Sequence, residues 1–147
     1  MERRGRFWWA WLIVVTIGVE ALGLVLVLAP AVGRRVFGLL IFGSSTGIEE
    51  LGAAATPYIT LAHGVLGAVM LGWGAALLFI VLGPFRRGSR ESWFTLAVSV
   101  TAWFIADTAF SVWTGYWQNA ALNVVIGALF AIPLAATYRS FRRRKTR

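Results

Sequence analysis

The chain has 147 residues, of which 59% are hydrophobic and 14% are charged, and its mean hydropathy is +0.73. A soluble domain is about half apolar and about a quarter charged. The composition therefore excludes an ordinary soluble domain and indicates a single transmembrane domain over residues 1–147. The formal net charge is +8, and cysteine is absent, which excludes disulfides and thiolate chemistry.

Four segments are apolar over the roughly 20 residues that a bilayer-spanning helix needs. The sequence therefore predicts an all-α, integral membrane four-helix bundle. The predicted spans are residues 7–29, 57–83, 93–115 and 120–138. Pro30 and Pro84 are expected to close the first two spans, and Pro133 to kink the fourth. The first span is longer than the apolar core of a signal peptide, so we expect it to be retained.

Two connections between the spans carry predictions of their own. Between the first and second spans, the run VFGLLIFG is apolar but too short to span, which predicts a re-entrant or interface-lying amphipathic helix. In SSTGIEELG, which follows, Ser or Thr ahead of Glu49 and Glu50 indicates a helix start, so this connection is expected to form a small lid. The short YWQN turn predicts that the third and fourth spans form an antiparallel hairpin.

Arginine and lysine are distributed unevenly over the connections. Arg34 and Arg35 lie between the first and second spans. The other twelve lie at the termini and between the second and third spans: Arg3, Arg4, Arg6, Arg86, Arg87, Arg90, Arg139, Arg142, Arg143, Arg144, Lys145 and Arg147. Because cytoplasmic loops carry the excess of positive charge, we place both termini in the cytoplasm of a bacterial inner membrane. The basic tail at 139–147 is expected to contact anionic lipid headgroups, which favours a role in topology over nucleic-acid binding.

Small residues recur every fourth position in two spans, and small residues let membrane helices approach closely. We expect both ridges to pack within the chain, and the second to aim its asparagines into the bundle. The ridge of the second span is Gly64, Ala68, Gly72 and Ala76. The ridge of the fourth span is Asn119, Asn123, Gly127, Ala131 and Ala135.

The ionisable residues within the spans are Glu20, His63 and Asp107. Such residues are costly in a membrane and usually face the bundle interior or a water-filled cavity. Counting about 1.5 Å per residue from the outer helix ends puts these three at roughly 9 to 13 Å, and Asn123 at about 5 Å. The sequence therefore predicts one polar group from each helix in the outer half of the membrane.

These residues and their neighbours on the same helix faces form the predicted site. The candidates for catalysis are Asp107, His63 and Glu20. The candidates for ligand binding are Glu20, Thr60, His63, Trp103, Asp107, Ser111, Asn119 and Asn123. Trp103, Phe110 and Trp113 are expected to form an aromatic wall.

The favoured interpretation is a non-enzymatic pocket that binds a small lipophilic molecule or a lipid through a few polar groups. A purely structural polar core would instead hold the helices in register, as in an accessory subunit that docks on a membrane-protein partner. The remaining alternatives are an isomerase or hydratase that uses a carboxylate and His63 as acid and base, and proton-coupled transport. We predict no metal and no cofactor, because one histidine without a carboxylate three or four residues away does not form a helical ligand pair.

The first span ends in LAP, the second begins PYITLAHGVLGAVMLGW, and the last two meet in WFIADTAFSVWTGYWQNAALN. This pattern, over about residues 10–138, resembles small bacterial four-helix inner-membrane proteins of the broad DoxX-like kind. The resemblance implies the four-helix fold, and it carries over no functional residue. A more distant similarity is to the EXPERA group of sterol isomerases and sigma-2-receptor-like proteins, which bury acidic residues among membrane helices and bind lipophilic ligands.

Overall fold

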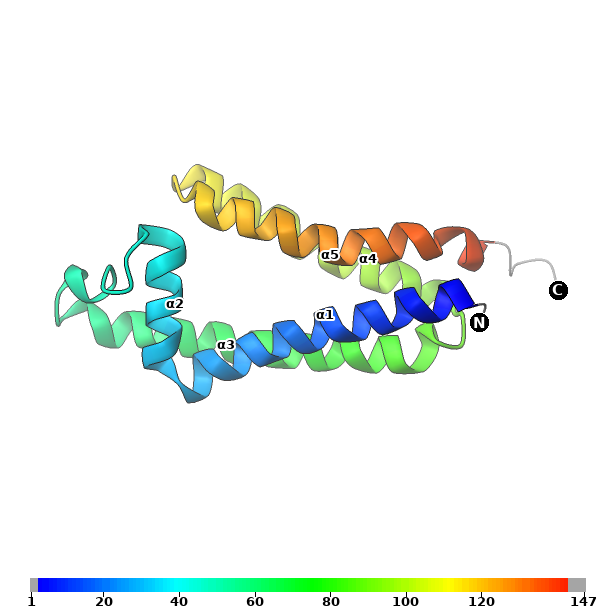
Figure 1. The fold of residues 1–147 in the computed structure, drawn as a ribbon, viewed down its shortest axis with the longest axis horizontal. Helices are drawn as coiled ribbons and strands as arrows, with labels where there is room; N and C mark the ends of the chain where they lie inside the picture. Colours follow the sequence, from blue (N-terminus) through cyan, green and yellow to red (C-terminus); the bar gives the residue numbers. More distant parts are fainter. Residues whose placement is uncertain (1–2, 143–147) are drawn as a thin grey trace. The chain divides into compact units, whose positions relative to one another are not determined.

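The structure is a computed structural model that describes residues 3–142, and within them every regular element is a helix. The long helices are α1 (Arg3–Leu28), α3 (Ala55–Ile80), α4 (Arg90–Trp113) and α5 (Trp117–Arg142) (Figure 1). The short elements are α2 (Pro30–Phe42), η1 (Glu49–Leu51) and η2 (Val81–Phe85). Four helices are long and apolar enough to cross a membrane, one of them formed by α3 and η2 together. The prediction of an all-α fold with four membrane-length helices and a short helix after the first is confirmed.

Two of the predicted helix ends need correction. Pro30 is not one of them: α1 ends at Leu28 just before it, and Pro30 begins α2, where its fixed φ and missing N–H suit the first helical position. Pro84, however, does not close the second span, because it lies inside the π-helical turn η2 that continues α3 to Phe85. The hairpin turn comes at residues 114–116 rather than at YWQN, so Trp117 and Asn119 already belong to α5.

The described residues group into two compact units. The first, called the α4–α5 unit, holds the start of α1 up to Ile17 and everything from Ala76 onward. The second, called the α2–α3 unit, is Gly18–Ala75 and holds the rest of α1, the whole of α2 and η1, and most of α3. The prediction of one transmembrane domain over 1–147 stays a prediction.

In the α2–α3 unit, α1 and α3 run antiparallel and meet at glycines. A methyl group added at Gly67 would lie 2.6 Å from the carbonyl oxygen of Gly23, so only glycine permits this approach. The predicted ridge of the second span is wrong, because Gly64 and Gly72 have no neighbour within 4 Å of such a methyl group. Each four-residue step overshoots a 3.6-residue turn by about 40°, so residues four apart drift around the helix. Gly67 and Gly74 are seven residues apart, which is close to two full turns, and they therefore lie on the same side of α3, facing α1.

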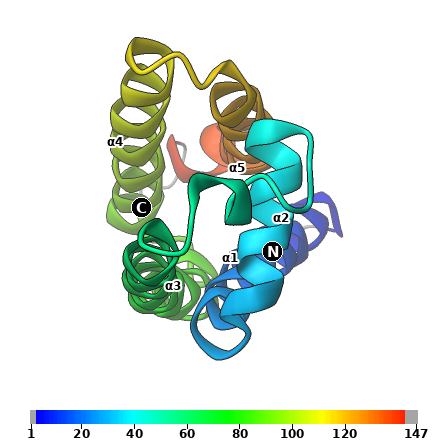
Figure 2. The same ribbon diagram turned by 90° about the vertical axis from the view of Figure 1, so that its left-hand side faces the viewer.

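The short helix α2 lies across α3 rather than alongside it (Figures 1 and 2). It ends at Gly43, whose positive φ of 69° closes the helix with backbone hydrogen bonds to Gly38 and Leu39. The predicted helix start before Glu49 is instead a series of turns leading into the single 3₁₀ turn η1. The side chain of Thr46 caps no helix, and it donates to Glu50 Oε1 at 2.9 Å.

The α4–α5 unit contains the predicted antiparallel hairpin, whose connecting turn is visible in Figure 2. The Trp93 indole donates to the carbonyl oxygen of Leu134 at 2.9 Å, and Phe104 packs on Gly127, where a methyl group would lie 2.9 Å from the ring. The ridge predicted for α5 is correct at Gly127 and wrong further along, because Ala131 and Ala135 are exposed. The buried residues in that part of α5 are Phe130, Pro133, Leu134, Thr137 and Phe141.

Two tryptophans of α1 stabilise the proline-containing segments of this unit. Pro133 has no N–H, so the carbonyl of Leu129, four residues earlier, lacks its helical partner. The Trp11 indole supplies a donor to that carbonyl at 2.9 Å. The Trp9 indole donates to the carbonyl oxygen of Val81 at the start of η2, also at 2.9 Å.

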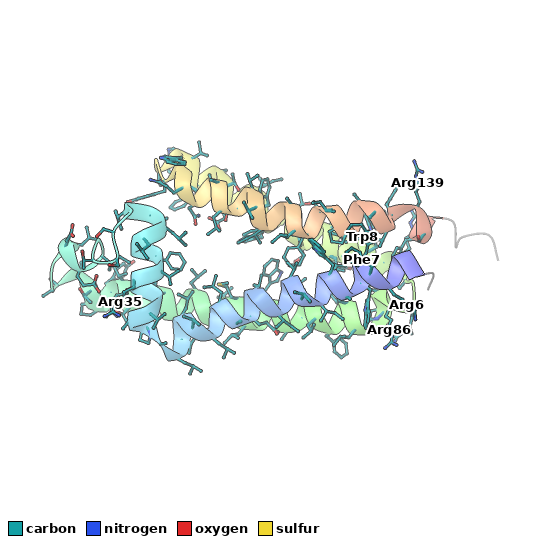
Figure 3. All side chains as sticks on the ribbon, viewed as in Figure 1. Arg6, Phe7, Trp8, Arg35, Arg86 and Arg139 are labelled. Atoms are coloured by element: carbon teal, nitrogen blue, oxygen red, sulfur yellow. The ribbon has the colours of Figure 1, made fainter. Side chains whose placement is uncertain are left out.

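The arginines of the α4–α5 unit gather at one end. Arg6, Arg86 and Arg139 all lie at the end where α1 begins (Figure 3). The guanidinium carbon of Arg86 stands 5.0 Å from the centre of the Trp9 ring, a cation–π contact of the kind that anchors helix ends at a membrane surface. Residues 143–147, which carry most of the predicted headgroup contact of the tail, lie outside the described part of the chain.

Candidate functional site

The predicted site residues divide between the two units. Asp107 and its neighbours Trp103, Ser111, Asn119 and Asn123 belong to the α4–α5 unit. Glu20, Thr60 and His63 belong to the α2–α3 unit. Each group is described below within its own unit.

Asp107, Ser111 and Asn119 form a closed hydrogen-bond network across the α4–α5 hairpin. Asn119 Nδ2 donates to Asp107 Oδ1 at 2.9 Å and to Ser111 Oγ at 2.8 Å. The Ser111 hydroxyl lies 2.7 Å from the carbonyl oxygen of Asp107 and 3.2 Å from its carboxylate, and both can accept its proton. Asp107 therefore pairs with Asn119, and Asn123 lies about one turn deeper, roughly 6 Å along α5.

Asn123 and the aromatic residues differ from the prediction in detail. Asn123 is 2% exposed, and its Nδ2 has no hydrogen-bond partner among residues 3–142. Phe110 and Trp113 are 60% and 83% exposed and meet edge to face, with ring centres 6.2 Å apart. Because both side chains are so exposed, they do not enclose Asp107 in the predicted aromatic wall, although Phe110 is its neighbour at i+3 on α4.

Glu20 lies on α1 over Gly74 of α3. A methyl group at position 74 would come 2.5 Å from Glu20 Cγ, so the absence of a side chain makes room for the glutamate. His63 is eleven residues from Gly74 on α3, or roughly 16 Å along the helix. The common depth predicted for Glu20 and His63 is therefore wrong, because α3 extends past the end of α1 and the two helix ends are not level.

Thr60 and His63 instead face α2, in what we call the Arg34 site: Arg34, Phe37, Glu49, Thr60 and His63. Arg34 donates through Nη1 to Thr60 Oγ1 at 2.9 Å, and Thr60 donates onward to the carbonyl oxygen of Thr56 at 2.8 Å. One turn further along both helices, the rings of Phe37 and His63 lie 4.8 Å apart at 33°. The two contacts fix α2 on the first turns of α3.

The Arg34 site contains polar atoms that the protein does not satisfy. Arg34 Nε and His63 Nδ1 are both buried, and neither finds a hydrogen-bond partner in the described part of the chain. The nearest carboxylate is that of Glu49, with Oε1 3.8 Å from Arg34 Nε, which is beyond hydrogen-bond length. The side chain of Arg34 is 18% exposed and that of Glu49 is 45% exposed. The site thus presents an unsatisfied cation near the surface.

Sequence reasoning found Thr60 and His63 but missed Arg34, Phe37 and Glu49. Arg34 was interpreted only through its charge, as one of the two basic residues on the less basic side. Its position four residues after the helix-starting Pro30 was the available signal, because it places the guanidinium in the second turn of a helix too short to span.

The chain matches no family model, no curated protein and no solved structure. Within residues 3–142, no three histidine or acidic side chains come together in a group that could hold a metal ion.

Proposed function

We propose that this protein is a multi-pass membrane protein that binds a lipid, or a small lipophilic molecule with a polar end, at the Arg34 site. The observation that carries the proposal is the buried Arg34 Nε, whose N–H finds no acceptor in residues 3–142. An unsatisfied buried donor costs about 1–3 kcal/mol. A ligand oxygen at this position would remove that cost.

The surroundings of Arg34 suit a ligand that is polar at one end and apolar elsewhere. One face of α2 carries the half-buried Arg34 and Phe37 toward α3. The other face exposes apolar side chains, with Val32, Leu39 and Phe42 each between 46% and 55% exposed. A helix with this division is typical of one that lies in the membrane interface. A lipid could therefore place its headgroup at Arg34 and its chains along α2.

The proposed orientation puts α2 on the outer side of a bacterial inner membrane and both termini in the cytoplasm. Its support is the excess of arginine at the opposite connections and the clustering of Arg6, Arg86 and Arg139 at one end of the α4–α5 unit. Because the chain lacks cysteine, Ser45→Cys and Ser140→Cys place single thiols at two exposed positions. A membrane-impermeant maleimide applied to intact cells should label the first and spare the second. The reverse labelling would overturn the orientation.

Lipid binding is tested by native mass spectrometry of the full chain released from detergent micelles. The wild-type protein should retain an adduct of lipid mass, and Arg34→Gln should lose it. Arg35→Gln is the matched control, because it removes the same charge from the next residue, which is exposed and, within residues 3–142, forms no hydrogen bond to Thr60 and no ion pair with Glu49. Equal retention by the three proteins would contradict the proposal.

The enzyme alternative is not supported within the α2–α3 unit, since Glu20 and His63 are separated by roughly 16 Å along α3 and cannot act on one substrate atom as acid and base.

A second candidate function is docking on a membrane-protein partner, and it is favoured by the ridge of small residues on α3 that packs against no other helix of its unit. Gly64 and Gly72 have no neighbour within 4 Å of an added methyl group, and Ala68 between them is exposed. Ala68→Leu should abolish co-purification of such a partner without loss of folding. The DoxX-like relationship remains a proposal as well.

A further inference from the structure

Resting on the proposed function, we infer that the ligand of the Arg34 site is an anionic phospholipid, and that Glu49 competes with its phosphate for Arg34. Glu49 would then be a built-in inhibitor: it occupies the approach to the cation until a phosphate displaces it. The inference names both the class of lipid and the means by which the site rejects uncharged ones.

The first support is the free edge of the Arg34 guanidinium. Nη1 is engaged by Thr60, which Thr56 holds in turn, so the orientation of the planar group is fixed. The edge formed by Nε and Nη2 is the one that takes two oxygens of a phosphate or carboxylate in a fork-like pair. The Nε atom of this edge has no hydrogen-bond partner in residues 3–142. The edge is therefore oriented for an anion with two oxygens.

The second support is that Glu49 is close enough to attract Arg34 but too distant to satisfy it. Its Oε1 lies 3.8 Å from Nε, whereas a charged N–H···O pair is about 2.7–2.9 Å long. Among the described residues, Arg34 is the only partner recorded for the Glu49 side chain. A single ion pair at this distance, with the glutamate side chain 45% exposed, is weak. Displacement of Glu49 by a phosphate therefore costs little.

The third support is the contrast between Glu49 and its neighbour Glu50. The Glu50 carboxylate accepts a hydrogen bond from Thr46 Oγ1 at 2.9 Å, so it is held within its own loop. It makes no recorded ion pair with Arg34 in the described chain. The two glutamates thus carry the same charge at adjacent positions, and only Glu49 faces the cation.

The test titrates the purified full chain with three probes and follows adducts by native mass spectrometry. The probes are phosphatidylglycerol, a diacylglycerol with the same acyl chains and no phosphate, and glycerol 3-phosphate. The wild type should prefer phosphatidylglycerol. Glu49→Gln should raise phosphatidylglycerol affinity by about two- to fivefold, the range expected when a weak ion pair is removed. It should leave the binding of the diacylglycerol unchanged, and Glu50→Gln should change the affinity for neither lipid.

The outcomes separate the inference from the proposed function. If Arg34→Gln binds phosphatidylglycerol as the wild type does, the proposed function itself fails. If Arg34→Gln loses about tenfold while Glu49→Gln equals the wild type, only the competition by Glu49 is overturned. Equal gains for Glu49→Gln and Glu50→Gln would also overturn it, because the effect would then be one of net charge. Displacement of phosphatidylglycerol by equimolar glycerol 3-phosphate would overturn the lipid as ligand in favour of a soluble phosphate ester.

Discussion

The two polar clusters of this protein are made of similar groups but differ in completeness. In the α4–α5 unit, Asp107 meets Asn119 and Ser111 at 2.9 and 3.2 Å, and the three side chains satisfy one another across the hairpin. In the α2–α3 unit, Arg34 meets Thr60 but keeps a buried Nε without a hydrogen bond in residues 3–142. The cluster of Asp107, Ser111 and Asn119 is closed by the protein, and the Arg34 cluster is left open. Asn123, one turn deeper on α5, stands outside the closed cluster and keeps a buried Nδ2 without a partner in residues 3–142.

This difference separates a polar group that holds helices together from one that is available to a ligand. Hydrogen bonds between membrane helices contribute about 0.6 kcal/mol each on average, which suits the fastening of a hairpin. An unsatisfied buried donor opposes folding. A ligand that accepts its hydrogen bond would remove this cost, and its binding would be favoured by the same amount of free energy. Substitutions at Asp107 should therefore change the stability of the protein, and substitutions at Arg34 should change its binding of lipid.

The largest effect on stability is expected at Gly67, where the contact between α1 and α3 depends on glycine. Gly67→Leu should destabilise the protein by about 1–3 kcal/mol or prevent its folding, because its Cβ would lie 2.6 Å from the Gly23 carbonyl oxygen. Gly64→Leu is the control on the same helix, where an added Cβ meets nothing within 4 Å. Unfolding in detergent mixtures measures both. Equal loss in the two variants would contradict the α1–α3 contact.

Asp107→Leu should cost about 1–2 kcal/mol of stability, because Asn119 loses an acceptor and Ser111 a neighbour. Asp107→Asn should cost less, since its amide oxygen can accept from Asn119 in place of the carboxylate. The comparison is made by thermal unfolding in detergent. If the asparagine variant were as unstable as the leucine variant, the charge of Asp107 would matter and the closed network would not explain its role.

Arg34→Lys should weaken phosphatidylglycerol binding by about fivefold, or about 1 kcal/mol, with little change in stability. Lysine keeps the charge but lacks the paired Nε and Nη2 donors. Lipid titration followed by native mass spectrometry measures the effect. Unchanged affinity would mean that the site requires only a positive charge and not the guanidinium edge.

Thr60→Ala should have the smallest effect, a loss of about two- to threefold in phosphatidylglycerol affinity. Thr60 acts as a positioning residue, because its hydroxyl holds Nη1 of Arg34 at 2.9 Å. Thr56→Ala removes a hydroxyl one turn earlier on α3 that donates to Gly52 rather than contacting Arg34. The same titration should show no loss in that control, and loss in both variants would assign the effect to the helix rather than to Arg34.

Much of the fold could be predicted from the sequence, because long apolar segments bounded by proline and arginine fix the number of membrane-length helices. The two predicted packing ridges failed for one reason. Ridges drawn at four-residue steps ignore the drift of a 3.6-residue helix, so Gly72 was expected in a contact that Gly67 and Gly74 make. Sequence spacing within a helix is reliable over about two turns and misleading over five.

The candidate site was predicted less well. Its key contacts join residues on different helices, and no sequence pattern indicates how far one helix is shifted along its neighbour. Asp107 and Ser111 lie on one helix, and their association followed from spacing. Glu20 and His63 lie on helices whose ends are not level, so depths counted from those ends could not be compared. Arg34 was missed because its pairing with Thr60 depends on α2 lying across α3.

The most direct test of the contrast between the two clusters is the rise in unfolding temperature that phosphatidylglycerol produces in the full-length protein. A ligand that binds only the native state stabilises it by an amount that grows with the logarithm of the ligand concentration divided by Kd. Wild type and Asp107→Asn should both gain stability as phosphatidylglycerol is added, whatever the unfolding temperature of each without lipid, and Arg34→Gln should gain much less. A gain in Arg34→Gln equal to that of the wild type, or its loss in Asp107→Asn alone, would contradict the assignment of the open site to Arg34.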